Sequence, residues 1–522
     1  MKKLLIILIL ISFKSFAQAS SEKLSYHNIK TNEDGNILPW YSNNLGESYD
    51  HTINILWNFW DTMRTDMNGL PYYMNHQVWK KNFNDSRGIG GDQISMAISS
   101  WILYYDYTGN PRVLENVEFM ADYYLSHSLS SLECKWPNIP YPYNTLVYSG
   151  IYDGDMISGK GFTQPDKAGS FGNELMNLYK ITGNTRYIEA AIQIANTLSS
   201  HVVIGNNDQS PLPFRVNAET GKVGSLVQNG KVIIKYNYTT NWSGTLKLFS
   251  ELIFMKRGNW KFYQKCFNII LEWMKNYPLK TNKWGPFFED VGLWSDTQIN
   301  AVTFATYILN HTELFPNWKK DARGILDWVY IELGNDKWKR YGVTVVNEQT
   351  HYKVQGNSHT ARQGAAELLY ASKTGDMESR KLGLLQLNWS TYMVNDDGEN
   401  SYPNKGNETW MTDGYGDYVR HYLRAMQTYP ELSPENQNHL IKSSSVIKTI
   451  SYNNDEIDYE VFDKFSEEIL RLITKPKQII IDQRIIPESS NSSKNSWTWE
   501  QLNKGGILRI NNKNGNNVSI KL

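Results

Sequence analysis

The sequence is short of cysteine, of net charge and of motifs for metals or nucleotides. It holds two cysteines, Cys134 and Cys266, which leave one disulfide open but exclude a disulfide framework. Basic and acidic residues number 53 each, so no net field draws the chain to nucleic acid or to a membrane. Neither a Cys/His zinc spacing nor a glycine-rich phosphate loop occurs. We therefore predict no cofactor and no metal site, with a calcium ion at Asp153 and Asp155 left open.

The one long apolar run stands at the N-terminus. Lys2 and Lys3 precede the apolar residues 4–11, and residues 15–17 (Ser-Phe-Ala) form a small-x-small cleavage site. This order is typical of a secretory signal peptide. The run is too short to cross a bilayer. We expect residues 1–17 to be removed and the mature chain to be exported, to the periplasm or the medium, without membrane insertion.

A helical hairpin recurs along the chain. Leu-Tyr pairs lead to glycine turns at Gly109, Gly183 and Gly375, with weaker copies at Gly258 and Pro316. Amphipathic helical runs flank each turn, and a long polar return follows each pair. With further helices over 52–63 and 417–428, about six hairpins result. We therefore predict a mainly α fold, an (α/α)6 toroid of inner and outer helices over residues 18–435, with an open solenoid as the alternative.

The pattern changes to short alternating runs from about residue 457. Strands are predicted over 457–462, 478–482, 496–499, 506–510 and 518–520, separated by Asn/Ser/Gly turns. They indicate a small C-terminal β-sandwich-like domain over 446–522, joined by a linker over 430–445. The alternation describes a core and a surface, so we expect this domain to supply no catalytic group.

The long returns should meet at one face of the toroid, because the short glycine turns occupy the other. The fifth return runs from Thr350 into a helix N-terminus, where free N–H groups and the helix dipole favour anions. The structural alternative is that Asn357 and Ser358 only cap this helix. The candidates on the fifth return are His351, Tyr352, Gln355, Asn357, His359 and Arg362. The candidates on the other returns are His76, Arg87, Asp166, Trp242, Trp284, Glu289, Glu408, Trp410, Asp413 and Tyr415.

Several features together resemble a known group of enzymes. The repeated Leu-Tyr and Thr-Gly-Asn turns, the helix that begins Asp166-Lys167-Ala168-Gly169 and the small β tail resemble six-hairpin enzymes of carbohydrate breakdown. That group includes glucuronyl hydrolases and polysaccharide lyases. The pair Asn357 and His359 is similar to the Asn/His pair of helical-toroid uronate lyases. The chain also resembles exported enzymes of marine Bacteroidetes that attack uronate-rich polysaccharides such as ulvan. The resemblance covers about residues 50–430 and implies an anionic carbohydrate substrate.

The favoured mechanism is β-elimination from a uronic acid. Neutralising the C6 carboxylate makes the C5 proton removable by a base, while an acid protonates the leaving oxygen at C4. A sugar leaving group makes the enzyme a lyase, and a hydroxyl makes it a dehydratase; both leave an unsaturated uronyl end. The predicted bases are His359 and His351, the acids are Tyr352 and Tyr415, and the carboxylate ligands are Asn357, Gln355 and Arg362.

Two alternatives stay open. A glycoside hydrolase needs two carboxylates, and glucuronyl hydrolases of this architecture would place an Asp near the start of an inner helix, as Asp166 is. A non-catalytic glycan-binding protein is the third class, suited to the 18 Trp and 33 Tyr. Elimination is favoured because the fifth return lacks a carboxylate pair. The sugar, the mode of cleavage and a homodimer are left open. The carboxylates available for hydrolysis are Asp92, Asp166, Glu289, Asp290, Glu408 and Asp413.

Overall fold

Six inner helices form a closed ring. The computed structural model describes residues 18–75, 91–146, 149–288, 291–402, 408–409, 414–490 and 493–522. Each inner helix contacts the next along the chain, and the last contacts the first. The ring therefore closes, which confirms the (α/α)6 toroid and excludes the open solenoid. The inner helices are α3 (Gly91–Thr108), α5 (Pro165–Thr182), α7 (Ser243–Phe254), α10 (Gln298–Asn310), α12 (Asn357–Thr374) and α14 (Tyr415–Thr428).

Outer helices complete the hairpins. Five of them follow their inner partner directly, and α1 packs beside α14 to complete the sixth pair. The first predicted helix, over 52–63, is longer at its N-terminal end than expected, because Asn44 caps it by accepting a hydrogen bond from the Glu47 amide. The outer helices are α1 (Leu45–Asp61), α4 (Pro111–His127), α6 (Thr185–Ser200), α8 (Trp260–Asn276), α11 (Trp318–Leu333) and α13 (Met377–Thr391).

The short turns share one local chemistry. Gly183 and Gly375 end α5 and α12 in the left-handed conformation, with φ of +73° and +80°, which glycine adopts without strain. The next residue then caps the outer helix: the Asn184 side chain accepts from the Arg186 amide, and that of Asp376 from the Glu378 amide. In the Thr-Gly-Asn motif, the glycine is thus the C-cap of the inner helix and the next residue is the N-cap of the outer helix.

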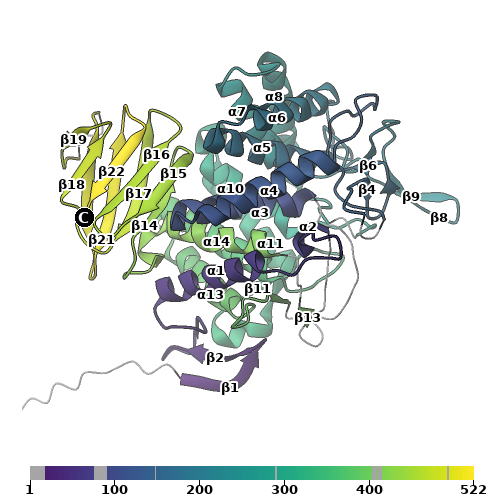
Figure 1. Cartoon of the computed structure of the whole chain (residues 1–522). Coiled ribbons are helices and arrows are strands. Elements are labelled where there is room, and N and C mark those ends of the chain that lie inside the picture. The colour runs from purple at the N-terminus through teal and green to yellow at the C-terminus, as the bar shows by residue number, and fades with distance from the viewer. Residues whose placement is uncertain are drawn as a thin grey trace, which may run out of the picture.

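The long returns lie at the opposite end of the toroid from the C-terminal domain (Figure 1). Short β-hairpins stiffen them, among them β4 (Gly154–Asp155) with β5 (Gly159–Lys160) and β8 (Ser225–Gln228) with β9 (Lys231–Lys235). A buried ion pair ties the second return (residues 136–167) to the third (residues 205–242), with Arg215 Nε 3.0 Å from Asp155 Oδ2. Arg215 also donates to the carbonyl of Phe288 in the fourth return (residues 281–296), at 3.2 Å. The returns therefore hold one another in place.

The C-terminal domain consists of two antiparallel sheets. One has the strand order β14-β17-β21-β20 and the other β15-β16-β22-β18-β19. The five predicted strands correspond to β16, β18, β20, β21 and β22, while β14 starts inside the stretch predicted as linker. The strands are β14 (His439–Ser443), β15 (Ile447–Tyr452), β16 (Glu456–Val461), β17 (Ser466–Leu472), β18 (Gln478–Ile481), β19 (Arg484–Ile486), β20 (Ser496–Gln501), β21 (Gly506–Asn512) and β22 (Asn517–Lys521).

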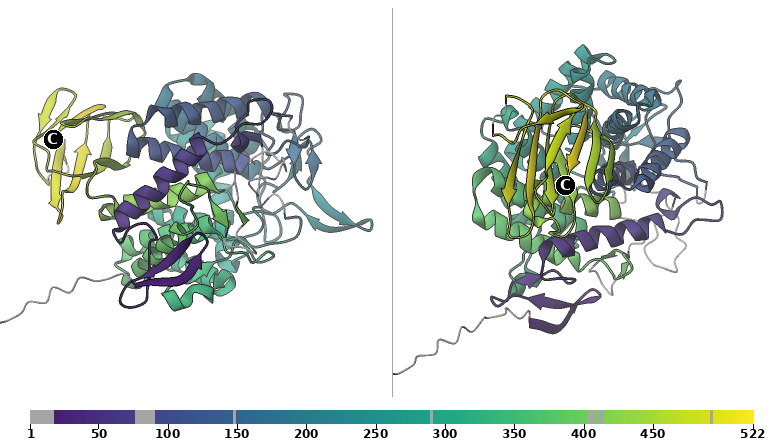
Figure 2. Two further views of the ribbon diagram at one scale, coloured as in Figure 1. Left: turned by 60° about the horizontal axis from the view of Figure 1, so that its bottom comes forward. Right: turned by 60° about the vertical axis from the view of Figure 1, so that its left-hand side comes forward.

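This domain covers the short-turn end of the ring, as the right-hand view of Figure 2 shows. The Tyr452 hydroxyl donates to the carbonyl of Asp106 at 2.7 Å and accepts from the Leu440 amide at 2.9 Å. Tyr179 of α5 meets Phe462 edge-on, with ring centroids 6.3 Å apart. The domain is therefore packed onto the toroid and closes one end of it.

An N-terminal sheet, which the sequence did not predict, packs on the outer surface. Its strands β1 (Gln18–Leu24), β2 (His27–Thr31) and β3 (Ile37–Leu38) share a small apolar cluster with α13.

Both cysteines, Cys134 and Cys266, are free thiols, so the disulfide left open by the sequence does not form here. In the part of the chain that the structure describes, no helix combines the length and the apolar character needed to cross a bilayer.

Candidate active site at the loop end of the toroid

The inner helices all begin at the end of the toroid where the long returns lie, which we call the loop end. Polar side chains from the first two turns of these helices meet there. Arg362, in the second turn of α12, donates from Nη1 to Gln298 Oε1 at 2.7 Å and from Nη2 to Asp417. Asp417 also accepts from Arg420 and lies 3.3 Å from Nε2 of His421. Three inner helices, α10, α12 and α14, thus share one buried polar network.

Burial and neighbouring charges set the protonation states of this network. Burial alone would raise the pKa of Asp417, but Arg362, Arg420 and His421 hold the pKa of that carboxyl well below its usual value. Burial lowers the pKa of His421 to about 3 and outweighs the opposing charge of Asp417. At neutral pH the network therefore contains an ionised carboxylate and a neutral imidazole.

His359 stands beside this network in the first turn of α12. Its side chain is 6% exposed and its ring lies 5.8 Å from that of Phe288. Burial and then the charge of Arg362 keep the pKa of His359 well below 6.5, so the imidazole is neutral and able to take a proton. Within the described ranges its buried Nε2 has no hydrogen-bond partner, so the hydrogen-bonding capacity of this ring nitrogen is unused.

A second cluster lies on α5 and the residues before α7. Asp166, in the first turn of α5, accepts from Asn241 Nδ2 at 2.9 Å and lies 3.3 Å from Lys167 Nζ. Lys167 also donates to the carbonyl of Phe287 at 2.9 Å. Asp166 and Lys167 are both buried, and the ring of Phe287 packs with Met96 in a small apolar cluster. The fourth return is therefore anchored over the loop end by a buried ion pair.

A cavity of about 490 Å³ lies inside the ring. Arg362, Arg420 and His421 line it near the loop end, and Lys442 and Ile469 of the C-terminal domain line it near the other end. Its wall between these ends is built by all six inner helices, α3, α5, α7, α10, α12 and α14. The polar network described above therefore borders a space large enough for a monosaccharide or a small anion.

Three predicted site residues belong to the core instead. Tyr415 is completely buried and stacks on Phe59, with ring centroids 5.3 Å apart. Its hydroxyl accepts from the Asn400 amide at 2.9 Å, and burial raises the pKa of Tyr415 well above 10. Trp242 and Trp284 are also fully buried. The predictions of Tyr415 as the acid and of Trp242 and Trp284 as substrate-binding residues are therefore wrong, because these side chains offer no free surface.

The candidate residues of the fifth return lie in different surroundings. His351 and Tyr352 are exposed, Tyr352 to 52%, whereas His359 and Arg362 lie side by side in the buried network. Gln355 accepts from Trp338 Nε1 at 3.0 Å and so braces its own return. Gly356, not Asn357, is the N-cap of α12. The structure thus brings together two of the six candidates of this return.

Other predictions lie outside the described residues. They concern His76, Arg87, Glu289, Asp290, Trp410 and Asp413, together with the side chains of Asp92, Asn357 and Glu408.

The structure bears on the calcium ion that the sequence left open at Asp153 and Asp155. Asp155 accepts from Arg215 and Gln164 with one oxygen and from the amides of Ile157 and Ser158 with the other. A carboxylate so fully bonded is a structural anchor, which argues against the calcium site.

Several residues of the buried polar network are not among the candidates predicted from the sequence. Asp417, Arg420 and His421 have i, i+3 and i+4 spacing on α14, which places them on one helix face. That spacing is the sequence pattern from which a shared polar cluster could have been predicted. Gln298 and Asn241 carried no such signal, because their roles depend on which helices adjoin in the ring.

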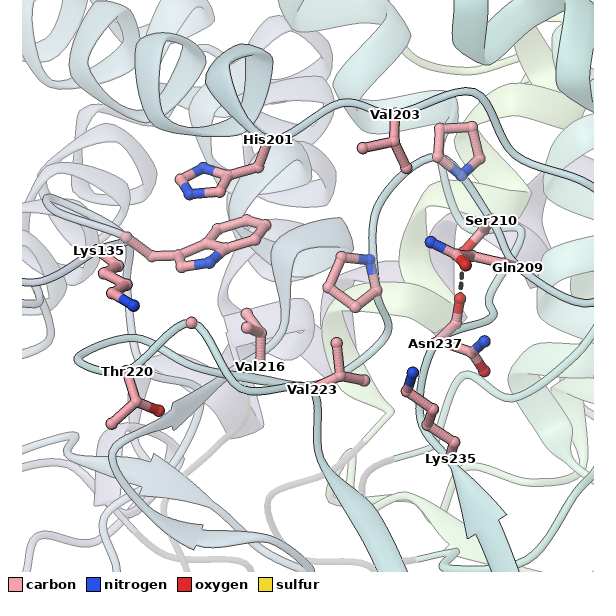
Figure 3. Close-up of a pocket in the computed structure, with 14 residues that line it drawn as sticks. Lys135, His201, Val203, Gln209, Ser210, Val216, Thr220, Val223, Lys235 and Asn237 are labelled. Atoms are coloured by element: carbon pink, nitrogen blue, oxygen red, sulfur yellow. Dashed lines mark hydrogen bonds between the residues drawn. The ribbon is translucent and has the colours of Figure 1, made fainter.

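A second hollow, of about 300 Å³, lies between the second and third returns. The ring of His201, labelled in Figure 3, stacks on that of Trp136, and the ring centroids are 3.9 Å apart. Trp136 is buried beneath this histidine, so it offers no free face to a sugar. Among the predicted site residues that the structure describes, none lines this hollow.

Comparisons with known proteins identify the fold. No family model matches the chain, and no curated protein matches its sequence. The structure is similar to a cellobiose 2-epimerase from Spirochaeta thermophila DSM 6192, with a TM-score of 0.55 and 10% identity over 74% of this chain and 96% of that one. It is similarly close to a cellobiose 2-epimerase from Bacillus thermoamylovorans B4167, with a TM-score of 0.55 and 14% identity over 73% and 98%.

A D-mannose isomerase gives a TM-score of 0.54 and 12% identity over 73% of this chain and 97% of that one. These identities are too low to carry an activity across. They show a shared fold, and they agree with the six-hairpin architecture expected from the sequence.

Proposed function

We propose that this protein is a carbohydrate-active enzyme that removes a C–H proton from an anionic sugar, with His359 as the base. The observation that carries the proposal is the neutral imidazole of His359, whose Nε2 is buried and without a hydrogen-bond partner among the described residues. It stands at the loop end of a toroid beside a cationic network. A neutral histidine in such surroundings is suited to general-base catalysis.

The reaction proposed is β-elimination from a uronate, as in degradation of an ulvan-like poly- or oligosaccharide. His359 takes the C5 proton, the electron pair of the C–H bond forms the C4–C5 double bond, and the C4–O bond breaks. Tyr352, on the exposed part of the fifth return, replaces Tyr415 as the proposed proton donor to the leaving oxygen. The N-terminus of α12 and the charges of Arg362 and Arg420 favour the negative charge that develops on the carboxylate.

Arg362 acts through its neighbours in this scheme. Its guanidinium is already bonded to Gln298 and Asp417, so it fixes the network and lowers the pKa of His359. The fold neighbours are named as sugar epimerases and an isomerase, and both of those reaction types relocate a proton on a sugar carbon. These named reaction types support proton transfer at a sugar carbon as the general chemistry. Within that chemistry, we propose elimination for this protein.

The test is a direct assay of products. Purified protein is incubated with uronate polysaccharides and oligosaccharides, and ultraviolet absorbance of the C4–C5 double bond is followed. We expect absorbance to rise, and His359→Ala to reduce the rate roughly 10²–10⁴-fold. His127→Ala, on the outer helix α4, is the matched control and should keep full activity. A fully active His359→Ala enzyme would exclude this mechanism.

Hydrolysis is the second candidate, because Oδ1 of Asp166 is buried without a hydrogen-bond partner among the described residues. New reducing ends without ultraviolet absorbance would establish it. A changed sugar configuration with neither signal, detected by nuclear magnetic resonance, would establish epimerisation. Export remains a proposal that rests on residues 1–17, and N-terminal sequencing of the native protein tests it by asking whether the mature chain begins at Gln18.

A further inference from the structure

The cavity inside the toroid carries a large excess of positive charge, which begins at Arg362 and Arg420 beside the candidate catalytic histidine. Glu174 is the one acidic residue among the described residues that line it. The cations that line it are Lys247, Arg362, Lys373, Arg420, Arg424 and Lys442. Asp417 offsets Arg362 and Arg420 from behind the wall. The remaining cations therefore face one another across a shared space.

Lys247 on α7 and Arg424 on α14 both line this cavity, and the charge of Glu174 acts on both of them. In the described part of the chain, neither of them forms an ion pair. Glu174 is held by the amides of Asn173 and Asn177, at 2.9 and 3.0 Å. Lys247 and Arg424 thus line one cavity without an ion-pair partner, and an anion in the cavity would offset the repulsion between them.

The titration behaviour of these groups agrees with their placement. Burial and then the charges of Arg424 and Arg420 lower the pKa of Lys247 to about 8. Burial and then Arg420 lower the pKa of Arg424 to about 9.

We propose that this cavity is a binding site for a tetrahedral oxyanion, sulfate or phosphate, held between Lys247, Arg420 and Arg424. Arginine and lysine give charge-assisted hydrogen bonds to such oxygens. Neutral residues such as Ser170 and Thr306 complete the wall, and their hydroxyls donate to the carbonyls of Asp166 and Val302 in their own helices. The oxyanion is either a free ion or the ester group of a sugar. This site does not depend on the role proposed for His359.

The first experiment is thermal unfolding of the full chain in sodium sulfate or sodium phosphate, with ionic strength matched by sodium chloride. Sulfate or phosphate should raise the unfolding temperature, because a ligand that binds only the folded state stabilises it. Lys247→Met should weaken sulfate binding roughly ten- to hundredfold, which corresponds to one charged hydrogen bond. Lys319→Met, exposed on α11, is the matched control and should bind as wild type does.

The variants also separate this proposal from a structural role. Without sulfate, Lys247→Met should unfold at a temperature no lower than wild type, because it removes repulsion from Arg424. Arg424→Gln should behave in the same way, and His359→Ala should keep the sulfate response. Equal effects of chloride and sulfate, or a sulfate response that survives both cavity substitutions, would overturn the proposal.

A crystal grown with sodium selenate gives an independent result for the wild-type protein. Anomalous density between Lys247 and Arg424 supports the site, and an empty cavity overturns it. Glucose 6-sulfate and glucose 6-phosphate are then compared with the free ions. Tighter binding of the esters assigns the site to a sugar substituent, and tighter binding of the free ions assigns it to an inorganic anion.

Discussion

The ring of His359 lies directly against the backbone of Gly356, the residue that caps α12. A Cβ atom at Gly356 would collide with Nδ1 of that ring. The backbone of Gly356 has φ of −98°, which any residue can adopt, so the glycine is required for the space that the histidine occupies. The position of the candidate base is thus set by the residue three positions before it.

Gly356→Ala should displace His359 and reduce turnover while the fold persists. The alanine methyl group can fit only if the imidazole rotates or moves, which removes Nε2 from its place at the loop end. The rate is measured in the absorbance assay, and folding is checked by circular dichroism. The matched control is Gly324→Ala on the exposed side of α11, where a Cβ meets nothing. That control should keep activity and gain about 0.5–1 kcal/mol of stability.

Asp166→Asn should destabilise the protein whatever its effect on activity. It leaves the Lys167 ammonium buried without its carboxylate, which typically costs about 3–5 kcal/mol. Adding Lys167→Met to this variant should restore part of the stability, as denaturant unfolding can measure. Asp122→Asn, which breaks the exposed pair with Arg186, should change stability by at most about 1 kcal/mol. If the double variant is stable but inactive, Asp166 acts in the chemistry itself.

Gly109→Ala should cost more stability than Gly183→Ala, although both residues occupy the same turn of neighbouring hairpins. Both have positive φ, +67° and +73°, so both variants lose roughly 1–2 kcal/mol through backbone strain. A Cβ at Gly109 would also lie 3.0 Å from Cδ2 of Tyr452, whereas one at Gly183 meets nothing within 4 Å. Thermal unfolding of the two variants compares these costs, and equal losses would contradict the tight packing of the C-terminal domain there.

The toroid could be predicted because its information is local and repeated. A glycine followed by Asn or Asp occurs in the short turns at Gly109, Gly183, Gly258 and Gly375, and the helical periodicity lies in adjacent residues. The N-terminal sheet and β14 carried weaker patterns. Their strands are short, and the structure pairs β14 with β17, which lies more than twenty residues further along the chain. Such pairing is decided by packing between distant segments and not by local sequence.

The site could be predicted in part. His359 and Arg362 were identified because they begin a helix after a polar return. The partners that determine their chemistry, Gln298 and Asp417, come from other helices and meet them only in the closed ring. Tyr415 was misassigned because its position in sequence does not reveal that its ring packs on Phe59. The direction of a side chain on an inner helix depends on which neighbours the ring supplies.

The stability of the ligand-free protein should rise with pH above about 8, through Lys247. The groups that face this ammonium are Arg420 and Arg424 on α14, Glu174 on α5 and His311 after α10. The folded protein releases the proton of Lys247 near its lowered pKa of about 8, while the unfolded chain keeps it up to the usual 10.5. Between these values the unfolded state binds more protons, so the free energy of unfolding increases with pH.

Lys247→Met isolates this contribution from that of other titrating groups. At pH 7.5 the variant should be more stable than wild type, because wild type carries the full charge repulsion. At pH 10 the difference should be much smaller, because the folded wild type has lost that charge. Thermal unfolding of both proteins at the two pH values gives the comparison. A difference that stays constant would show that the charge of Lys247 is already compensated, and sulfate, by raising the pKa of Lys247, should move the transition to higher pH.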